Sequence, residues 1–168
     1  MSRYMSYSLY PPKNEFDWSC YELYKRQNKI YWVSTEFEPS LDKKCYDGLS
    51  PMKKKLIDGV LLFFVMADGI ISENINLSLA QVPLPMRKRK IDYFSAFLAI
   101  QQAIEIVHAE TYGKFIQTFV PDQDWVPHIE NSPSLLRKLE FMKKYMSADS
   151  DPVSTMTAAA CIEGIFFR

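Results

Sequence analysis

The sequence has few of the residues that favour a disulfide-bonded, fibrous or disordered protein. It contains only 3 cysteines, Cys20, Cys45 and Cys161, and only 5 glycines, whereas 48% of its 168 residues are hydrophobic. No two cysteines have the C-x-x-C spacing, which argues against a zinc ribbon or a disulfide framework and predicts free, buried thiols. A chain of this length and hydrophobicity is expected to fold as one compact domain, or as part of a larger one, with a substantial core.

Net charge and long apolar runs are also missing. The 20 basic and 20 acidic side chains cancel, which removes the long-range attraction on which most nucleic-acid binders depend. The longest near-apolar stretch, residues 56–71, contains Asp58 and Asp68 and falls short of the roughly 18–20 apolar residues of a membrane span. Residues 1–16 lack the apolar segment of a secretion signal. We therefore expect a cytoplasmic protein that binds neither nucleic acid nor a membrane.

Apolar residues recur with helical spacing along most of the chain, and no stretch alternates convincingly as a strand. Proline follows serine or aspartate at Ser50-Pro51, Ser132-Pro133 and Asp151-Pro152, and each pair is a favourable start for a helix. The pattern predicts helices over about 15–32, 51–79, 86–119 and 134–146, and from 152 to 168. The predicted fold class is all-α, with residues 1–14 as an N-terminal tail and residues 15–168 as a single domain.

Two acidic residues stand inside apolar helical segments. Asp68 lies within LLFFVMADGII, and Glu163 lies within AAACIEGIFF. An ionised carboxylate in a core is costly unless it is paired, hydrogen-bonded or bound to a metal. Gly69 and Gly164 follow directly, so either acid alone could equally be a helix-face residue at a bend.

A third acid lies on the predicted long helix with a histidine beside it. Glu105 and His108 are spaced i, i+3, and Tyr112 follows His108 by four residues, so all three share the apolar stripe while Glu110 points towards solvent. One E-x-x-H is weak evidence, because a core histidine satisfied by an acid explains it equally well. Inward acids on two helices and an inward E-x-x-H on a third are, however, how dinuclear iron or manganese sites are built in ferritin-like bundles.

At these residues the sequence resembles the small, radical-generating subunit of class I ribonucleotide reductase. The matching segments are FFVMADGIISENI (63–75), EIVHAETYGKFIQTFV (105–120) and CIEGIFF (161–167), with a weaker match in YELYKRQNKIYW (21–32). They occur in the order of the family and cover most of the chain. The resemblance implies a ferritin-like helical bundle.

The resemblance gives each inward donor a role. Asp68, Glu105 and His108 would bind one metal ion and its bridge, and Glu163 would bind the second ion of a dinuclear iron, manganese or mixed centre. The second E-x-x-H of the family is missing: His128 lies in a predicted loop with no glutamate three residues before it. We therefore expect a bundle that is incomplete at its C-terminal end, binds metal poorly and is catalytically silent alone.

Three aromatic residues also match positions of the family. Tyr112 matches the tyrosine that the metal centre oxidises to a stable radical, and Trp32 matches the tryptophan that relays an electron towards the centre. Phe167, one helical turn beyond Glu163, would line the apolar pocket that protects the radical. Each could instead be an ordinary packed aromatic residue, since the chain has 10 tyrosines and 11 phenylalanines.

The resemblance implies an oxidoreductase subunit for deoxyribonucleotide synthesis and DNA replication. In this family the radical passes to a large subunit, where ribonucleotides are reduced, and the complete small subunit is expected to be a homodimer. Two alternatives stay open on the sequence. One is another ferritin-like di-metal oxidase that uses the same ligands, and the other is a non-catalytic helical interaction protein derived from the family.

Overall fold

The structure, a computed structural model, describes residues 8–77, 85, 91–119, 130–147 and 150–166. Its longer helices are α1 (Glu15–Lys29), α3 (Pro51–Leu77), α4 (Tyr93–Phe119), α6 (Pro133–Tyr145) and α7 (Pro152–Cys161). Shorter helical turns are Ser34–Glu36, Pro39–Asp42, α2 (Lys43–Asp47) and a π-helical turn, Ile162–Phe166, that continues α7. No strand occurs within these ranges, so the all-α prediction is confirmed.

The boundaries of two predicted helices were wrong. α1 ends at Lys29 rather than Trp32, because the backbone N–H of Ile30 bonds to the carbonyl of Gln27 and the chain then leaves the helix. The predicted helix over 86–119 is not continuous, because residues 91 and 92 are not helical and α4 begins at Tyr93. Just before this start, Asp92 accepts a hydrogen bond from the backbone N–H of Ser95 at 3.0 Å. The predicted helix start at 86–90, the breaks at Pro83, Pro121 and Pro127, His128, and the helix end at 167–168 lie outside the described residues.

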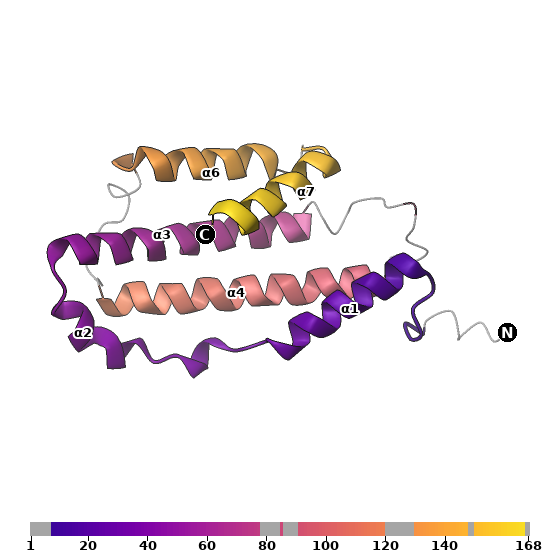
Figure 1. Cartoon of the computed structure of the whole chain (residues 1–168), viewed down its shortest axis with the longest axis horizontal. Helices are drawn as coiled ribbons and strands as arrows, with labels where there is room; N and C mark the ends of the chain where they lie inside the picture. Colours follow the sequence, from indigo (N-terminus) through magenta and orange to yellow (C-terminus); the bar gives the residue numbers. More distant parts are fainter. Residues whose placement is uncertain (1–7, 78–84, 86–90, 120–129, 148–149, 167–168) are drawn as a thin grey trace.

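The two long helices α3 and α4 run antiparallel through the middle of the molecule (Figure 1). α1 packs against α4, while α6 and α7 lie on the opposite side of α3. The buried core is formed mainly by apolar side chains of α3, α4 and α6, among them Leu62, Ala67, Ile71, Leu98, Leu139 and Met142. This arrangement leaves the seam between α3 and α4 flanked by α1 on one side and α7 on the other.

The position of α1 on α4 is fixed by a buried aspartate and an aromatic pair. Asp17 is buried, and its Oδ1 accepts a hydrogen bond from the backbone N–H of Tyr93 at 3.1 Å. The rings of Tyr21 and Tyr93 meet edge to face with centroids 4.8 Å apart. The start of α4 is therefore tied to α1, which sets where the later residues of α1 fall along α4.

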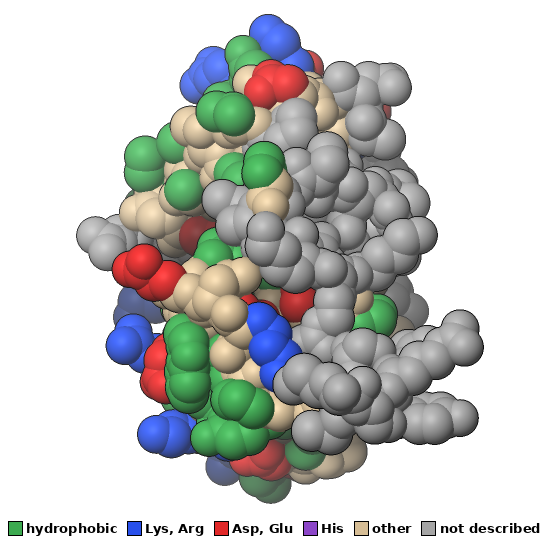
Figure 2. All heavy atoms as spheres, turned by 90° about the vertical axis from the view of Figure 1, so that its right-hand side faces the viewer, with side chains coloured by type: hydrophobic (Ala, Val, Ile, Leu, Met, Phe, Trp, Pro, Cys, Tyr) green, Lys and Arg blue, Asp and Glu red, His purple; other side chains and the backbone are tan. Residues whose placement is uncertain are grey.

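The described surface carries side chains of both charges (Figure 2), and the cysteines follow the sequence prediction with one correction. In the end-on view, acidic and basic side chains alternate around exposed apolar ones (Figure 2). The three cysteines are free as predicted, but only Cys20 is buried, because Cys45 lies on the single exposed turn of α2 and Cys161 is half-buried. None of the described helices combines the length and apolar character needed to cross a membrane.

Tyr46 attaches the one-turn helix α2 to both long helices, by a buried hydrogen bond to α3 and by a ring stack on α4. The hydroxyl of Tyr46 donates to Oδ1 of Asp58 on α3 at 2.6 Å, and both side chains are buried. The ring of Tyr46 stacks on Phe119 of α4 with centroids 4.4 Å apart. Asp58 therefore lies in an apolar segment, but its carboxylate has a hydrogen-bond partner, the hydroxyl of Tyr46.

Tyr46→Phe is expected to lower the free energy of unfolding by about 1–3 kcal/mol, because Asp58 loses a buried hydrogen-bond donor while the ring packing is kept. Thermal unfolding followed by circular dichroism measures the change. Tyr31→Phe is the matched control, since Tyr31 is exposed, and its melting temperature should stay at the wild-type value. Equal melting temperatures for the two variants would show that the bond to Asp58 adds no stability.

Candidate metal centre

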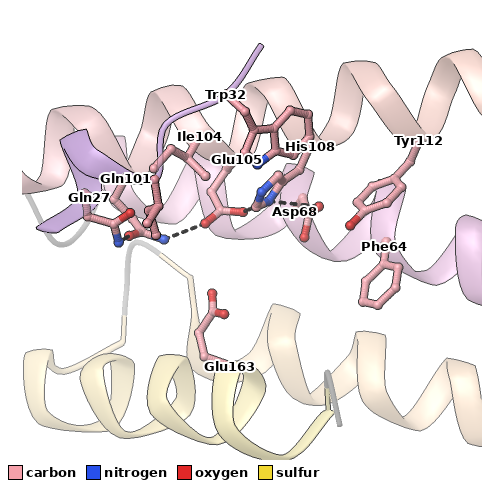
Figure 3. Close-up of a pocket in the computed structure, with 11 residues that line it drawn as sticks. Gln27, Trp32, Phe64, Asp68, Gln101, Ile104, Glu105, His108, Tyr112 and Glu163 are labelled. Carbon is pink, nitrogen blue, oxygen red and sulfur yellow. Dashed lines mark hydrogen bonds and ion pairs between the residues drawn. The ribbon is translucent and has the colours of Figure 1, made fainter. Parts of the chain in front are cut away.

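Three predicted donors meet in the seam between α3 and α4 (Figure 3). Nδ1 of His108 lies 3.3 Å from Oε2 of Glu105 and 3.8 Å from Oδ2 of Asp68. One ligand atom from each residue falls within 4.8 Å of the other two. Both acids are almost completely buried, with 1% of Asp68 and 2% of Glu105 exposed. The i, i+3 spacing on α4 therefore does bring an acid and an imidazole together opposite Asp68.

Glu163 comes to the same pocket from a different element. It lies on the π-helical turn after α7, and its carboxylate points across the pocket towards the other donors (Figure 3). The residue as a whole is exposed to solvent rather than buried, so the predicted burial of this acid is wrong. The direction of its side chain is the one that the sequence predicted.

The pocket concentrates negative charge that the protein only partly neutralises. Burial, followed by repulsion from Glu105, raises the pKa of Asp68 to about 7. Partial desolvation of the carboxylate at the pocket, and then the charge of Glu105, raise the pKa of Glu163 to about 6. The hydrogen bond to Glu105 raises the pKa of His108. Oδ2 of Asp68 is buried without a hydrogen-bond partner among the described residues, which leaves an acceptor that a cation can satisfy.

Two predicted aromatic residues border this cluster. The indole of Trp32 stacks on the imidazole of His108, with centroids 5.3 Å apart and planes inclined by 30°. The ring of Tyr112 lies 6.2 Å from that of His108 and stacks on Phe64 at 5.1 Å. Burial raises the pKa of the Tyr112 hydroxyl. The structure thus places Trp32 and Tyr112 on either side of His108, while Phe167 lies outside the described residues.

Several lining residues were not predicted to act at the site. The pocket has a volume of about 330 Å³, and it is also lined by Gln27, Ile30, Phe64, Gln101 and Ile104. Gln101 lies one turn before Glu105 on the same stripe, a spacing that could have indicated contact. Gln27 gave no local signal, because its partner is 74 residues away along the chain.

The face of α4 that points away from the pocket carries Glu110, which the sequence predicted to point towards solvent. Glu110 is exposed and forms an ion pair with Lys114, whose Nζ lies 3.0 Å from the carboxylate. Lys114 also donates to the hydroxyl of Ser34 at 3.0 Å. These contacts attach the segment after Trp32 to α4, which keeps the indole beside His108.

The family to which the chain belongs follows from its similarity to known proteins. Residues 7–168 match the family described as ribonucleotide reductase, small chain. The chain belongs to this family. Its ferritin-like helical fold agrees with a solved structure from Streptococcus sanguinis, described as dimanganese(II)-NrdF. The chain is similar to that structure with a TM-score of 0.66 at 20% identity, covering 92% of this chain and 52% of that one.

Curated small chains of the reductase from distant organisms are similar over nearly the whole sequence. A ribonucleoside-diphosphate reductase small subunit of Plasmodium falciparum is 30% identical over 151 residues, which cover 88% of this chain and 45% of the relative. A small chain of the reductase from Arabidopsis thaliana is 30% identical over 152 residues, covering 88% and 44%. The small chain of Acanthamoeba polyphaga mimivirus is 30% identical over 166 residues, covering 96% and 38%. The chain therefore spans less than half the length of these curated relatives.

Proposed function

We propose that this chain is part of a ribonucleoside-diphosphate reductase small subunit and holds part of a dinuclear metal centre that generates a tyrosyl radical. The observation that carries the proposal is the buried Oδ2 of Asp68. It has no hydrogen-bond partner among the described residues and lies 3.8 Å from Nδ1 of His108. An acid with only a structural role would be expected to have its acceptors satisfied, as Asp58 has by Tyr46.

The donors have the chemical types that such a centre needs, and their number suffices for part of it. Asp68, Glu105 and His108 would hold one ion, and Glu163 would hold a second. Carboxylates with an imidazole suit iron or manganese better than zinc. When bound, a pair of such ions supplies one-electron oxidising chemistry with dioxygen, which side chains do not perform unaided. The described donors are fewer than two ions require, so tight loading depends on further ligands.

Tyr112 is the residue we propose to be oxidised. Its ring is half-buried, stacks on Phe64 and lies one helical turn beyond His108. Burial, and then the charges of Asp68 and Glu105, raise the pKa of its hydroxyl. Oxidation therefore has to remove the phenolic proton together with the electron. The apolar contact with Phe64 shields the resulting radical from water.

Trp32 offers a route for electrons between the pocket and the surface. Its indole stacks on His108 on one side and meets the exposed ring of Phe37 at 5.0 Å on another. We propose that the complete subunit is a cytoplasmic homodimer, passes its radical to the large subunit and thereby supports reduction of ribonucleotides to deoxyribonucleotides.

The test uses a joined chain, in which residues 1–168 are followed by the remaining C-terminal portion of the Arabidopsis small chain. After loading with ferrous iron and exposure to air, electron paramagnetic resonance should show a tyrosyl radical. Residues 1–168 alone should bind fewer than two iron ions per chain and give no radical. A joined chain that binds two ions but never forms a radical would overturn the reductase proposal and favour a different di-metal oxidase.

A further inference from the structure

Two glutamine side chains form a hydrogen-bonded chain that runs from α1 to Glu105 (Figure 3). Nε2 of Gln27 donates to Oε1 of Gln101 at 2.8 Å. Nε2 of Gln101 donates in turn to Oε1 of Glu105 at 2.6 Å. The other carboxylate oxygen, Oε2, lies 3.3 Å from Nδ1 of His108. Each oxygen of Glu105 thus faces a different group.

We propose that Gln101 is a positioning residue for the Glu105 carboxylate, and that Gln27 holds the Gln101 amide in place by donating to its oxygen. An amide has one donor end and one acceptor end. Because a carboxylate oxygen only accepts, the NH₂ group of Gln101 points at Glu105, and the oxygen of Gln101 is left to accept from Nε2 of Gln27. A reversed Gln101 would set its carbonyl oxygen against a carboxylate oxygen, which is repulsive.

A neutral donor suits this place better than a charged one. A lysine or arginine at position 101 would also bond to Glu105, but its charge would neutralise the carboxylate and compete with a cation. The amide holds Oε1 in place and leaves the negative charge of Glu105 available on the side of His108 and Asp68. Outer hydrogen bonds of this kind orient ligating carboxylates in metal sites. The metal-binding consequence rests on the proposed function, whereas the hydrogen-bonded chain does not.

The contacts between α1 and α4 give α1 a role at the pocket. Asp17 and Tyr21 tie α1 to the first residue of α4, and Gln27 is reached two to three helical turns later, opposite Gln101. α1 therefore delivers both Gln27 and, just beyond its end, Trp32 to the pocket.

The first test uses nuclear magnetic resonance to follow the side-chain amide of Gln101 in the metal-free protein. In the ¹³C,¹⁵N-labelled protein of residues 1–168, the Gln101 side-chain amide protons should exchange slowly with water and lie downfield of those of exposed glutamines. Gln27→Leu should speed their exchange, and the carboxyl ¹³C resonance of Glu105 should move in Gln101→Leu. A Gln101 amide that exchanges like an exposed one, or that ignores Gln27→Leu, would overturn the proposal.

The second test is a Mn²⁺ titration of the same protein, in which free Mn²⁺ is followed by electron paramagnetic resonance. Gln101→Leu should weaken Mn²⁺ binding by about 10-fold or more, since loss of an outer-shell partner typically costs 10–100-fold. Gln27→Leu should weaken it less, and Gln102→Leu should not change it, because Gln102 does not line the pocket. Unchanged binding in Gln101→Leu would refute the positioning role. If the wild type binds no Mn²⁺ while the amide resonances behave as expected, the metal proposal fails and the positioning of Glu105 stands.

Discussion

Asp68→Asn is expected to raise the stability of the metal-free protein at pH 8 and to abolish its Mn²⁺ binding. Burial and Glu105 raise the pKa of Asp68 from 3.8 to about 7, so the folded state binds this proton more tightly than the unfolded state does. Stability therefore falls as the pH rises from about 4 to about 7, and the full cost remains above that range. Asparagine has nearly the same shape without the charge.

The gain in stability should depend on pH. At pH 8 we expect about 2–4 kcal/mol, given 1.36 kcal/mol per pKa unit, and a melting temperature higher by roughly 5–10 °C. At pH 5 the gain should be much smaller, because Asp68 is then protonated in the folded protein. Thermal unfolding at the two pH values, with the Mn²⁺ titration, measures both effects.

Asp58→Asn is the matched control for this variant. Asp58 is also a buried acid on α3, but it accepts the hydroxyl of Tyr46 at 2.6 Å. Its replacement should bring no gain in stability at pH 8 and no change in Mn²⁺ binding. A loss of stability in Asp68→Asn at pH 8 would identify Asp68 as a structural acid satisfied by His108, against the metal-site interpretation.

Tyr112→Phe in the joined chain is expected to remove the tyrosyl radical completely while the iron content stays unchanged. Phenylalanine keeps the stacking on Phe64 but has no hydroxyl from which a proton and an electron can leave. Electron paramagnetic resonance and iron analysis of the same samples separate the two properties. Ribonucleotide reduction supported by the large subunit should fall to background.

Tyr145→Phe controls for the loss of any tyrosine. Tyr145 is half-buried on α6, where its ring meets Phe141 at 4.9 Å, and it does not line the pocket. The radical should survive this change. A radical that persists in Tyr112→Phe would show that another tyrosine is oxidised and that the position assigned on α4 is wrong.

Local sequence signals were enough to predict most of the helices and to single out the donor residues of the pocket. Asp68 stood out because it is a charge within an apolar stretch, and Glu105, His108 and Tyr112 because their spacing places them on one face of a helix. These features depend only on residues close together in the sequence. The predicted convergence of α3 and α4 followed from the resemblance to the reductase family rather than from periodicity.

The features that were missed depend on long-range contacts or on local departures from the α-helix. The bond from Gln27 to Gln101 joins different helices, and so does that from Tyr46 to Asp58. Glu163 lies on a π-helical turn and is exposed there. Helical spacing predicts which way a side chain points, but it does not predict how deeply it is buried.

The most direct test of the account is the position of a cation in crystals soaked with Mn²⁺, located by its anomalous scattering. We expect one peak within coordination distance of Asp68, Glu105 and His108, with the imidazole binding through Nδ1. A pocket without a peak, in which Nδ1 of His108 stays bonded to Glu105 and a water satisfies Asp68, would contradict the claim that these side chains are built to share a metal ion.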